Sequence, residues 1–302
     1  RTFASHRGGV MGTLIRPSLP SGRAAMVASM SAIRAVLRRV DELPEAASGA
    51  LEYDDGCILV ENRRVCWAAC TRARRRLTDI LMQRASPPVE QSRIEQVVKS
   101  CRGGTLPIGE ALVQSGLVTE EQLGASLRQH ITESICLLAA SNTIRERWVP
   151  RTRPRYDARF TFSTIELSCS AGALRAPDLA LRATAELRDV LAAEARGVAF
   201  VRDPGSASPL MLAEVRCDVF STDSVLSLCE WTLGIFDVSA SITPDLKMAI
   251  GTWRAGAVVT AWQVADTTHV ALCEGPAFAM LATRLSDTRL QAAARAPEPG
   301  EL

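Results

Sequence analysis

In the second half of the chain, apolar runs separated by turn residues predict a β-hairpin. The apolar run 197–201 is followed by Asp203-Pro204-Gly205, which favours a turn, and a second apolar run spans 210–215. Short apolar runs bounded by glycine and proline are typical of buried strands. We therefore expect two neighbouring strands here.

The next segment, 222–236, has only Asp223 and Glu230 as charged residues, and its spacing predicts a helix. At about 100° per residue its apolar side chains cover roughly 220°, whereas a helix that buries one face needs a stripe of roughly 100°. One sheet cannot cover so wide an apolar surface. We therefore expect a second partner for this helix, with the candidate interface residues Val225, Leu228, Trp231 and Ile235.

Three further strands are predicted at 246–253, 255–263 and 268–273, followed by a last helix at 277–290. A helix before the hairpin completes the order helix, two strands, helix, three strands, helix. This order resembles the Roadblock/LC7 module, a small α/β dimerisation platform. The resemblance implies a homodimer that meets through the helix at 222–236, and a non-enzymatic role in regulating small Ras-like GTPases or as a scaffold.

The first half of the chain has a different pattern. Apolar residues recur every three or four positions from 25 to 40, which predicts a helix. Three short apolar runs between 49 and 68, joined by tight turns, predict a β-meander. A helix with Leu77, Ile80 and Leu81 on one side follows, and the prolines after it end it.

The segment 108–140 predicts a helical hairpin. Gly116 stands where the first helix would end in the left-handed region, and Thr119 with Gln122 forms a capping box for the second helix. The second helix carries an apolar stripe that runs to about Ala140. Both helices are therefore expected to pack as a pair.

The residues after the hairpin predict a change of structure. Residues 142–159 are rich in arginine and proline and are expected to be irregular, 160–167 predicts a strand, and 170–177 predicts an interdomain connection. Together, residues 26–168 resemble the PATAN domain of bacterial signalling proteins. The motifs that carry this resemblance are Gly56-x-Ile58-x-Val60, Arg64-Val65-Cys66-Trp67-Ala68, Gly109-x-x-Leu112-x-x-x-Gly116 and Arg159-Phe160-x-Phe162.

These patterns predict an α+β protein. A small β-meander with a helical hairpin comes first, followed by a Roadblock/LC7-like α-β-β-α-β-β-β-α sandwich. The expected divisions are a disordered tail (1–25), the PATAN-like domain (26–168), a linker (169–177), the Roadblock/LC7-like domain (178–290) and a second tail (291–302).

Composition is that of a globular chain, with 47% hydrophobic and 23% charged residues among 302. The formal net charge of +2 disfavours a general nucleic-acid or membrane-surface binder. Lys99 and Lys247 are the only lysines, so a P-loop or a Schiff base has almost no candidate residue. The nine dispersed cysteines favour reduced thiols in the cytoplasm, and no apolar run reaches the roughly 18 residues that span a bilayer.

No motif predicts catalysis. The chain has no GxGxxG, GxxxxGK[ST], HExxH or GxSxG sequence. Cys66-x-x-x-Cys70 could supply two zinc ligands, but His6, His130 and His269 add no second ligand pair, so buried thiols are the simpler interpretation. We expect no enzymatic activity, no metal and no cofactor.

Two features leave other functions open. The 105–130 hairpin resembles the cyclic di-GMP-binding repeat of type II secretion ATPase N-terminal domains, although Pro107 and His130 stand where that motif has arginine and glutamine. The run 145–159 could present a basic face to an acidic protein surface or, as the less favoured case, to nucleic acid. The arginines proposed for that face are Arg145, Arg147, Arg151 and Arg153.

The sequence therefore predicts a cytoplasmic, non-enzymatic bacterial signalling adaptor or scaffold. We expect a homodimer that binds a protein partner, such as a small Ras-like GTPase, and makes no membrane contact. The alternative is a ligand-sensing module that binds a cyclic dinucleotide or another nucleotide at the 105–130 hairpin or at the 145–159 loop.

Overall fold

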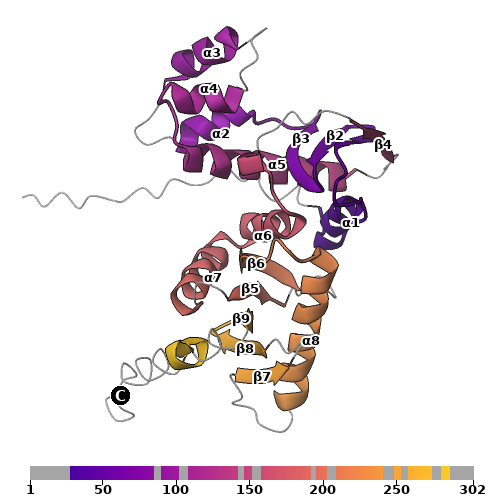
Figure 1. Cartoon of the computed structure of the whole chain (residues 1–302), viewed down its shortest axis with the longest axis vertical. Coiled ribbons are helices and arrows are strands. Elements are labelled where there is room, and N and C mark those ends of the chain that lie inside the picture. Colours follow the sequence, from indigo (N-terminus) through magenta and orange to yellow (C-terminus); the bar gives the residue numbers. More distant parts are fainter. Residues whose placement is uncertain are drawn as a thin grey trace, which may run out of the picture.

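The chain forms two antiparallel sheets that follow one another along the long axis of the molecule, with helices between and around them (Figure 1). This confirms the predicted α+β fold class. The predicted tails at 1–25 and 291–302 lie outside the described residues. The computed structural model describes residues 28–84, 90–101, 108–141, 146–151, 158–191, 195–202, 209–240, 248–252, 258–273 and 280–285.

The first sheet contains the predicted meander. Asn62 and Arg63 both have positive φ angles, 50° and 56°, and make the tight turn between its second and third strands. A fourth strand pairs with the first, so the spatial order is β3-β2-β1-β4. The strands are β1 (Gly49–Tyr53), β2 (Gly56–Glu61), β3 (Arg64–Cys70) and β4 (Glu146–Pro150).

Five helices accompany the first sheet in the described part of the chain. Of these, α1 (Met30–Asp41) and α5 (Glu120–Ala139) bury their apolar stripes in the same core as the strands. Helices α2 (Leu77–Arg84) and α4 (Ile108–Gln114) pack beside α5, and α3 (Gln91–Ser100) packs against α2 and α4. The helical hairpin α4–α5 is as predicted: Gly116 has a φ of +67°, and Thr119 and Gln122 make both bonds of the capping box. The sequence interpretation missed α3.

The second sheet has the predicted order of elements along the chain. These are α7 (Pro177–Val190), β5 (Arg196–Val201), β6 (Leu210–Val215), α8 (Thr222–Ala240), β7 (Met248–Thr252), β8 (Val258–Val264), β9 (Thr267–Cys273) and a helical segment at 280–285. In space the strands lie in the order β6-β5-β9-β8-β7. The hairpin β5–β6, the apolar helix and the three later strands are therefore confirmed.

Helices cover both faces of the second sheet (Figure 1). On one face, Val225, Cys229 and Phe236 of α8 share a core with Val198 and Phe200 of β5. On the other face lie α7 and the helical segment 280–285, which bury Leu187, Leu281 and Leu285.

Two sequence predictions are wrong between the sheets. The strand expected at 160–167 and the connection expected at 170–177 are replaced by helix α6 (Thr164–Arg175), because Ser163 and Glu166 form a capping box that starts a helix there. Of the expected strand, only Phe162 pairs with another strand. Its backbone exchanges two hydrogen bonds with Val65, with N-to-O distances of 2.8 and 2.9 Å. Helix α6 lies between α5 and β6 (Figure 1).

The segment expected to be irregular, 142–159, contains a strand and a short 3₁₀ helix in its described residues. Strand β4 pairs in register with β1 along its whole length, from Gly49 with Pro150 to Tyr53 with Glu146. The backbone of a neighbouring strand can order an arginine-rich stretch that has no apolar periodicity of its own. Residues 142–145 and 152–157 lie outside the described residues, and η1 spans Ala158–Phe160.

We call the first sheet with α1 to α5 the first unit, and the second sheet with α7, α8 and the segment 280–285 the second unit. Polar contacts that we call the polar seam join the two units through α6. The Asp41 carboxylate at the end of α1 accepts hydrogen bonds from the Thr164 hydroxyl (2.7 Å) and from the Thr222 N–H at the start of α8 (3.1 Å). The Arg64 guanidinium on β3 reaches Glu166 of α6 at 3.0 Å and Asp218, which precedes α8, at 3.5 Å. The seam therefore connects α1, β3, α6 and α8.

Candidate functional site

The predicted interface residues of α8 divide between its two sides. Val225 and Leu228 are buried inside their own chain, against the second sheet and its neighbours. Trp231 is 40% exposed and Ile235 is half-buried. Val238, about two helical turns beyond Trp231, is 65% exposed.

Strand β7 lies beside this exposed part of α8 and ends the sheet order. A side chain added at Gly251 of β7 would meet the Trp231 ring at 3.4 Å, so Trp231 lies over this strand. Successive side chains on a strand alternate between faces, so Ile250, which is 55% exposed, points to the face opposite Trp231. Exposed apolar side chains therefore flank β7 on both faces. We call Trp231, Ile235, Val238 and Ile250 the α8–β7 surface.

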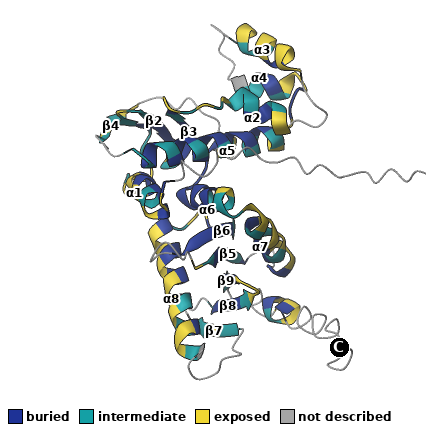
Figure 2. Ribbon diagram, turned by 180° about the vertical axis from the view of Figure 1, so that it is seen from behind, coloured by how far each residue is buried: buried dark blue, intermediate teal, exposed yellow. Residues whose placement is uncertain are grey.

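The sequence of β7, Met248-Ala249-Ile250-Gly251-Thr252, has neither a charge nor a proline. Its outer edge pairs with no strand in the described part of the chain. Natural proteins usually protect such edges with lysine, proline or a bulge, because an unpaired strand edge is a template for another chain. Figure 2 shows exposed residues along the outer side of α8, beside β7.

The structure describes two of the four arginines predicted for the basic face. Arg147 lies on β4 and pairs with Glu52 on β1 at 2.5 Å. Arg151 follows the strand, is exposed, and donates its backbone N–H to the Ser48 carbonyl at 2.8 Å. Arg145 and Arg153 lie outside the described residues. The glutamate opposite Arg147 reduces the local positive charge that a partner would meet.

A second group of arginines lies between β3 and α2, and two of its four members pair with carboxylates of the same part of the fold. The four are Arg72, Arg74, Arg75 and Arg76. Arg72 pairs with Asp55 at 3.2 Å, and Arg75 pairs with Glu133 of α5 at 2.9 Å. These contacts tie the segment before α2 to the meander and to α5. They favour a structural role for Arg72 and Arg75.

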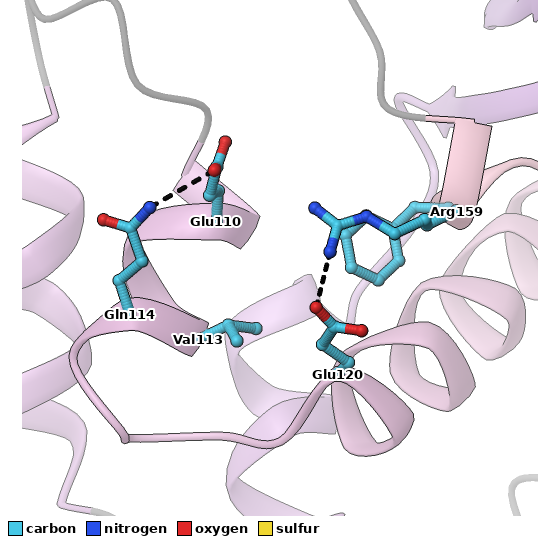
Figure 3. Close-up of a pocket in the computed structure, with 6 residues that line it drawn as sticks. Glu110, Val113, Gln114, Glu120 and Arg159 are labelled. Carbon is cyan, nitrogen blue, oxygen red and sulfur yellow. Dashed lines mark hydrogen bonds and ion pairs between the residues drawn. The ribbon is translucent and has the colours of Figure 1, made fainter.

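A shallow pocket of about 230 Å³ lies where the helical hairpin meets the end of the arginine-rich segment (Figure 3). Glu110 accepts a hydrogen bond from Gln114 at 3.2 Å on α4, and Arg159 pairs with Glu120 on α5 at 2.5 Å. The Arg159 guanidinium also lies over the Phe160 ring, 5.6 Å from its centre. The lining residues are Glu110, Val113, Gln114, Glu120, Arg159 and Phe160.

The described lining residues of this pocket carry more negative than positive charge. Two carboxylates and one guanidinium line it, and the guanidinium already bonds one carboxylate. Among the described lining residues, a phosphate placed here would meet the Glu110 carboxylate and no cation besides Arg159. These described residues by themselves favour a neutral or positively charged group.

The cysteine and histidine candidates occupy packed positions. Cys66 and Cys70 are buried, and burial raises the pKa of the Cys66 thiol to about 12, which keeps it protonated at neutral pH. His130 packs against Trp67 with ring centres 4.8 Å apart. Among the residues that the structure describes, no group of three or more His, Cys, Asp or Glu side chains could hold a metal ion. His6 lies outside them.

Sequence reasoning missed the contribution of β7 and Val238 to the exposed surface. The missing charge at 248–252 was a signal for an open edge, but the strand order that leaves this edge free depends on pairing over long sequence distances. In the described part of the chain, no helix is long and apolar enough to cross a membrane. No family model matches this chain, and no curated protein matches it either.

Proposed function

We propose that this chain is a non-enzymatic bacterial signalling adaptor that works as a homodimer in the cytoplasm. The order of α7, β5, β6, α8, β7, β8, β9 and the helical segment 280–285 supports the proposal, because this order underlies the resemblance to the Roadblock/LC7 module. The meander β1–β3 and the α4–α5 hairpin carry the PATAN-like motifs and support a role in signalling.

The single observation that carries the proposal is the uncharged edge strand β7 with exposed apolar residues on both of its faces. A second copy that covers this edge would bury Trp231 and Ile250 and would pair the free backbone groups of β7. A two-fold dimer uses the same patch on both copies, so one surface is sufficient. The tryptophan is the side chain best suited to anchor such an interface.

The dimer is tested by measuring mass in solution. Light scattering and sedimentation of the whole chain at tens of micromolar should give a dimer. Trp231→Ala should raise the dissociation constant about 30-fold or more, because loss of an aromatic anchor at an interface centre costs about 2 kcal/mol or more. Ile250→Lys, which places a charge beside the edge, should give a monomer.

Leu181→Ala is the matched control for these variants. Leu181 is a 74% exposed apolar residue on α7, away from the α8–β7 surface, and its truncation should leave the dimer unchanged. A wild-type protein that is monomeric at tens of micromolar contradicts the proposal. Equal weakening by Leu181→Ala and Trp231→Ala would also count against it.

We propose a small Ras-like GTPase as the partner, on the basis of the resemblance alone. An adaptor without catalytic groups can shift a GTPase only by binding one nucleotide state better than the other. A pull-down from native cytosol should recover the partner, and its affinity should then differ between the GDP-loaded and GTP-loaded forms. Equal affinities would leave the chain without a regulatory effect on that GTPase.

A second candidate function is ligand sensing at the pocket lined by Glu110 and Arg159. The observation in its favour is that the pocket joins the helical hairpin to the end of the arginine-rich segment, the two places that the sequence singled out. Thermal-shift measurements should compare cyclic di-GMP and nucleoside triphosphates with arginine and spermidine. A shift by any of them that disappears in Glu110→Gln or Arg159→Gln supports sensing; no shift removes this candidate for those classes.

A further inference from the structure

His269 occupies an unusual position in the second sheet. It is the third residue of β9 and lies between Ala199 of β5 and Trp262 of β8 in the strand register. Its exposed fraction is 0%, and its ring stacks on the Trp262 ring with centres 5.2 Å apart and planes inclined by 13°. The two rings lie on the face that α7 covers, where the Glu186 carboxylate approaches His269.

The polar atoms in this layer lack hydrogen-bond partners in the described part of the chain. They are both ring nitrogens of His269, the Trp262 indole N–H and the Thr260 hydroxyl. Buried polar groups are nearly always bonded, and each exception calls for an explanation such as stored strain or a functional role. Thr260 and Trp262 are two residues apart on β8, so these groups share one face of the sheet.

Few charged groups face the imidazole. On α7 the nearest is Glu186, whose carboxylate oxygen lies 3.9 Å from Nε2 of His269 and whose pKa is raised, first by burial and then by Asp189. The remaining charged residues of α7 are exposed: Asp178, Arg182, Arg188 and Asp189.

In the described residues of the other elements around the ring, we find no contact that brings a charge to it. In the helical segment 280–285, Arg284 donates to backbone carbonyls at the end of α7, at 3.0 Å for Leu191. The strand neighbours of His269, Ala199 and Trp262, are uncharged. Among the residues that the structure describes, the Glu186 carboxylate is therefore the nearest group that could respond to a charge on the ring.

We propose that His269 is a proton-operated latch between the second sheet and α7. The neutral imidazole stays stacked on Trp262 beneath α7. A protonated imidazolium carries two N–H donors and a charge, and this buried layer solvates it poorly because the Glu186 carboxylate stays 3.9 Å from Nε2, beyond hydrogen-bond distance. Water can reach the charged ring only when α7 moves off the sheet, together with the segment 280–285 that packs in the same core. Acid therefore releases α7 and uncovers this face of the sheet.

The direction of the pH effect follows from the histidine. Burial lowers the pKa of His269 from 6.5 to about 4 while α7 is seated, and an exposed ring regains the ordinary value. The state with α7 packed on the sheet therefore has its full stability, relative to the open state, above pH 6.5. This stability falls as the pH decreases from 6.5 to about 4, and it stays constant at lower pH. Between pH 7 and pH 5 the opening equilibrium constant should rise about 20-fold.

Hydrogen exchange of the whole chain, followed by mass spectrometry, measures this opening segment by segment. After correction for the intrinsic pH dependence of exchange, amides of α7 and of 280–285 should lose about 20-fold in protection between pH 7 and pH 5. Amides of β5 and β9 should lose less, because the sheet itself stays paired. His269→Phe, which keeps an aromatic ring on Trp262 but cannot be protonated, should remove the change in α7.

His130→Phe is the matched control, because His130 is also a buried histidine packed on a tryptophan, in the other unit. It should leave the pH response of α7 intact, and so should Glu186→Gln. If His269→Phe does not fold, His269→Gln carries the same expectation. The proposal is overturned if wild-type α7 keeps its protection at pH 5, if His269→Phe responds like wild type, or if Glu186→Gln alone abolishes the response.

Discussion

At the scale of single residues, Gly172 sets how closely α6 approaches the second sheet. A Cβ atom at this position would lie 1.8 Å from the Met211 carbonyl oxygen of β6, closer than any real contact. The glycine is therefore required by packing, although it sits inside a helix where it weakens the backbone. Backbone oxygen, unlike the end of a flexible side chain, cannot move away without shifting the strand.

Gly172→Ala should destabilise the protein by about 2 kcal/mol or more, because α6 must move away from β6 and leave a gap. Gly124→Ala in α5 is the control: nothing lies within 4 Å of the added methyl group, and the change should stabilise by up to about 1 kcal/mol through helix propensity. Urea denaturation of both variants measures the difference. Two variants of equal stability would show that α6 does not pack against β6 in this way.

Trp231, Val225 and Leu228 show how far the candidate site could be predicted from sequence. The sequence predicted a wide apolar surface on α8, and in the structure this surface includes residues on both the sheet side and the exposed side of the helix. Helical spacing alone does not say which part of the arc the sheet takes, because that depends on how the sheet is placed against the helix. Trp231 is therefore exposed, as the predicted interface requires, whereas Val225 and Leu228 are not.

At the scale of elements, α8 begins under a cap that another helix supplies. Asp41 of α1 accepts the Thr222 N–H, and the Thr222 hydroxyl donates to Thr164 at 2.7 Å. The first N–H groups of a helix have no partner inside it, so a carboxylate there stabilises the helix. This cap is partly buried and fixes the positions of α1, α6 and α8 relative to one another.

Asp41→Ala should cost about 2 kcal/mol, since it leaves the Thr222 N–H and the Thr164 hydroxyl without their shared acceptor. Asp223→Ala removes another acid from the same helix end. Asp223 is exposed, and its ion pair with Arg38 is long, at 3.4 Å, so the expected loss of stability is below about 1 kcal/mol. Chemical denaturation of both variants tests the contrast. A loss for Asp223→Ala as large as that for Asp41→Ala would contradict it.

Helices and strands with one apolar face could be predicted from the spacing of their apolar residues. Helices and strands whose structure depends on packing or pairing with neighbouring elements could not. The helix α5 and the strands β1 to β3 have clear periodicity. Helix α6 is buried on several sides, and many of its buried residues are small, such as Ser168, Ala171 and Gly172. Its sequence therefore shows no single apolar stripe. Strand β4 gains its structure from pairing with β1. Helix α3 was missed although its apolar residues have helical spacing.

At the scale of the whole molecule, the two units share α6. It packs against α5 and α1 on one side and against β6 and α7 on the other. The Arg175 guanidinium at its end also donates to the Ala28 carbonyl before α1. A division of the chain at 169–177 would therefore cut through a helix that both units need.

A fragment spanning 158–290, which keeps α6, should melt cooperatively and at a higher temperature than a fragment spanning 178–290. The shorter fragment leaves the backbone and side chains of Leu210 and Met211 on β6 without the helix that covers them. Calorimetry of the two purified fragments provides the comparison. Equal melting temperatures would mean that α6 belongs to the first unit alone.

The rigid attachment of α8 at its start has a consequence for avidity. Thr222 is held by the first unit, and Trp231 lies nine residues later, about 14 Å along the helix axis. In a dimer joined at Trp231 and β7, the rigid helix α8 of each copy would hold its first unit at a fixed distance from the other. A target with two matching sites would bind the second copy at a high effective concentration, whereas a single site would gain nothing.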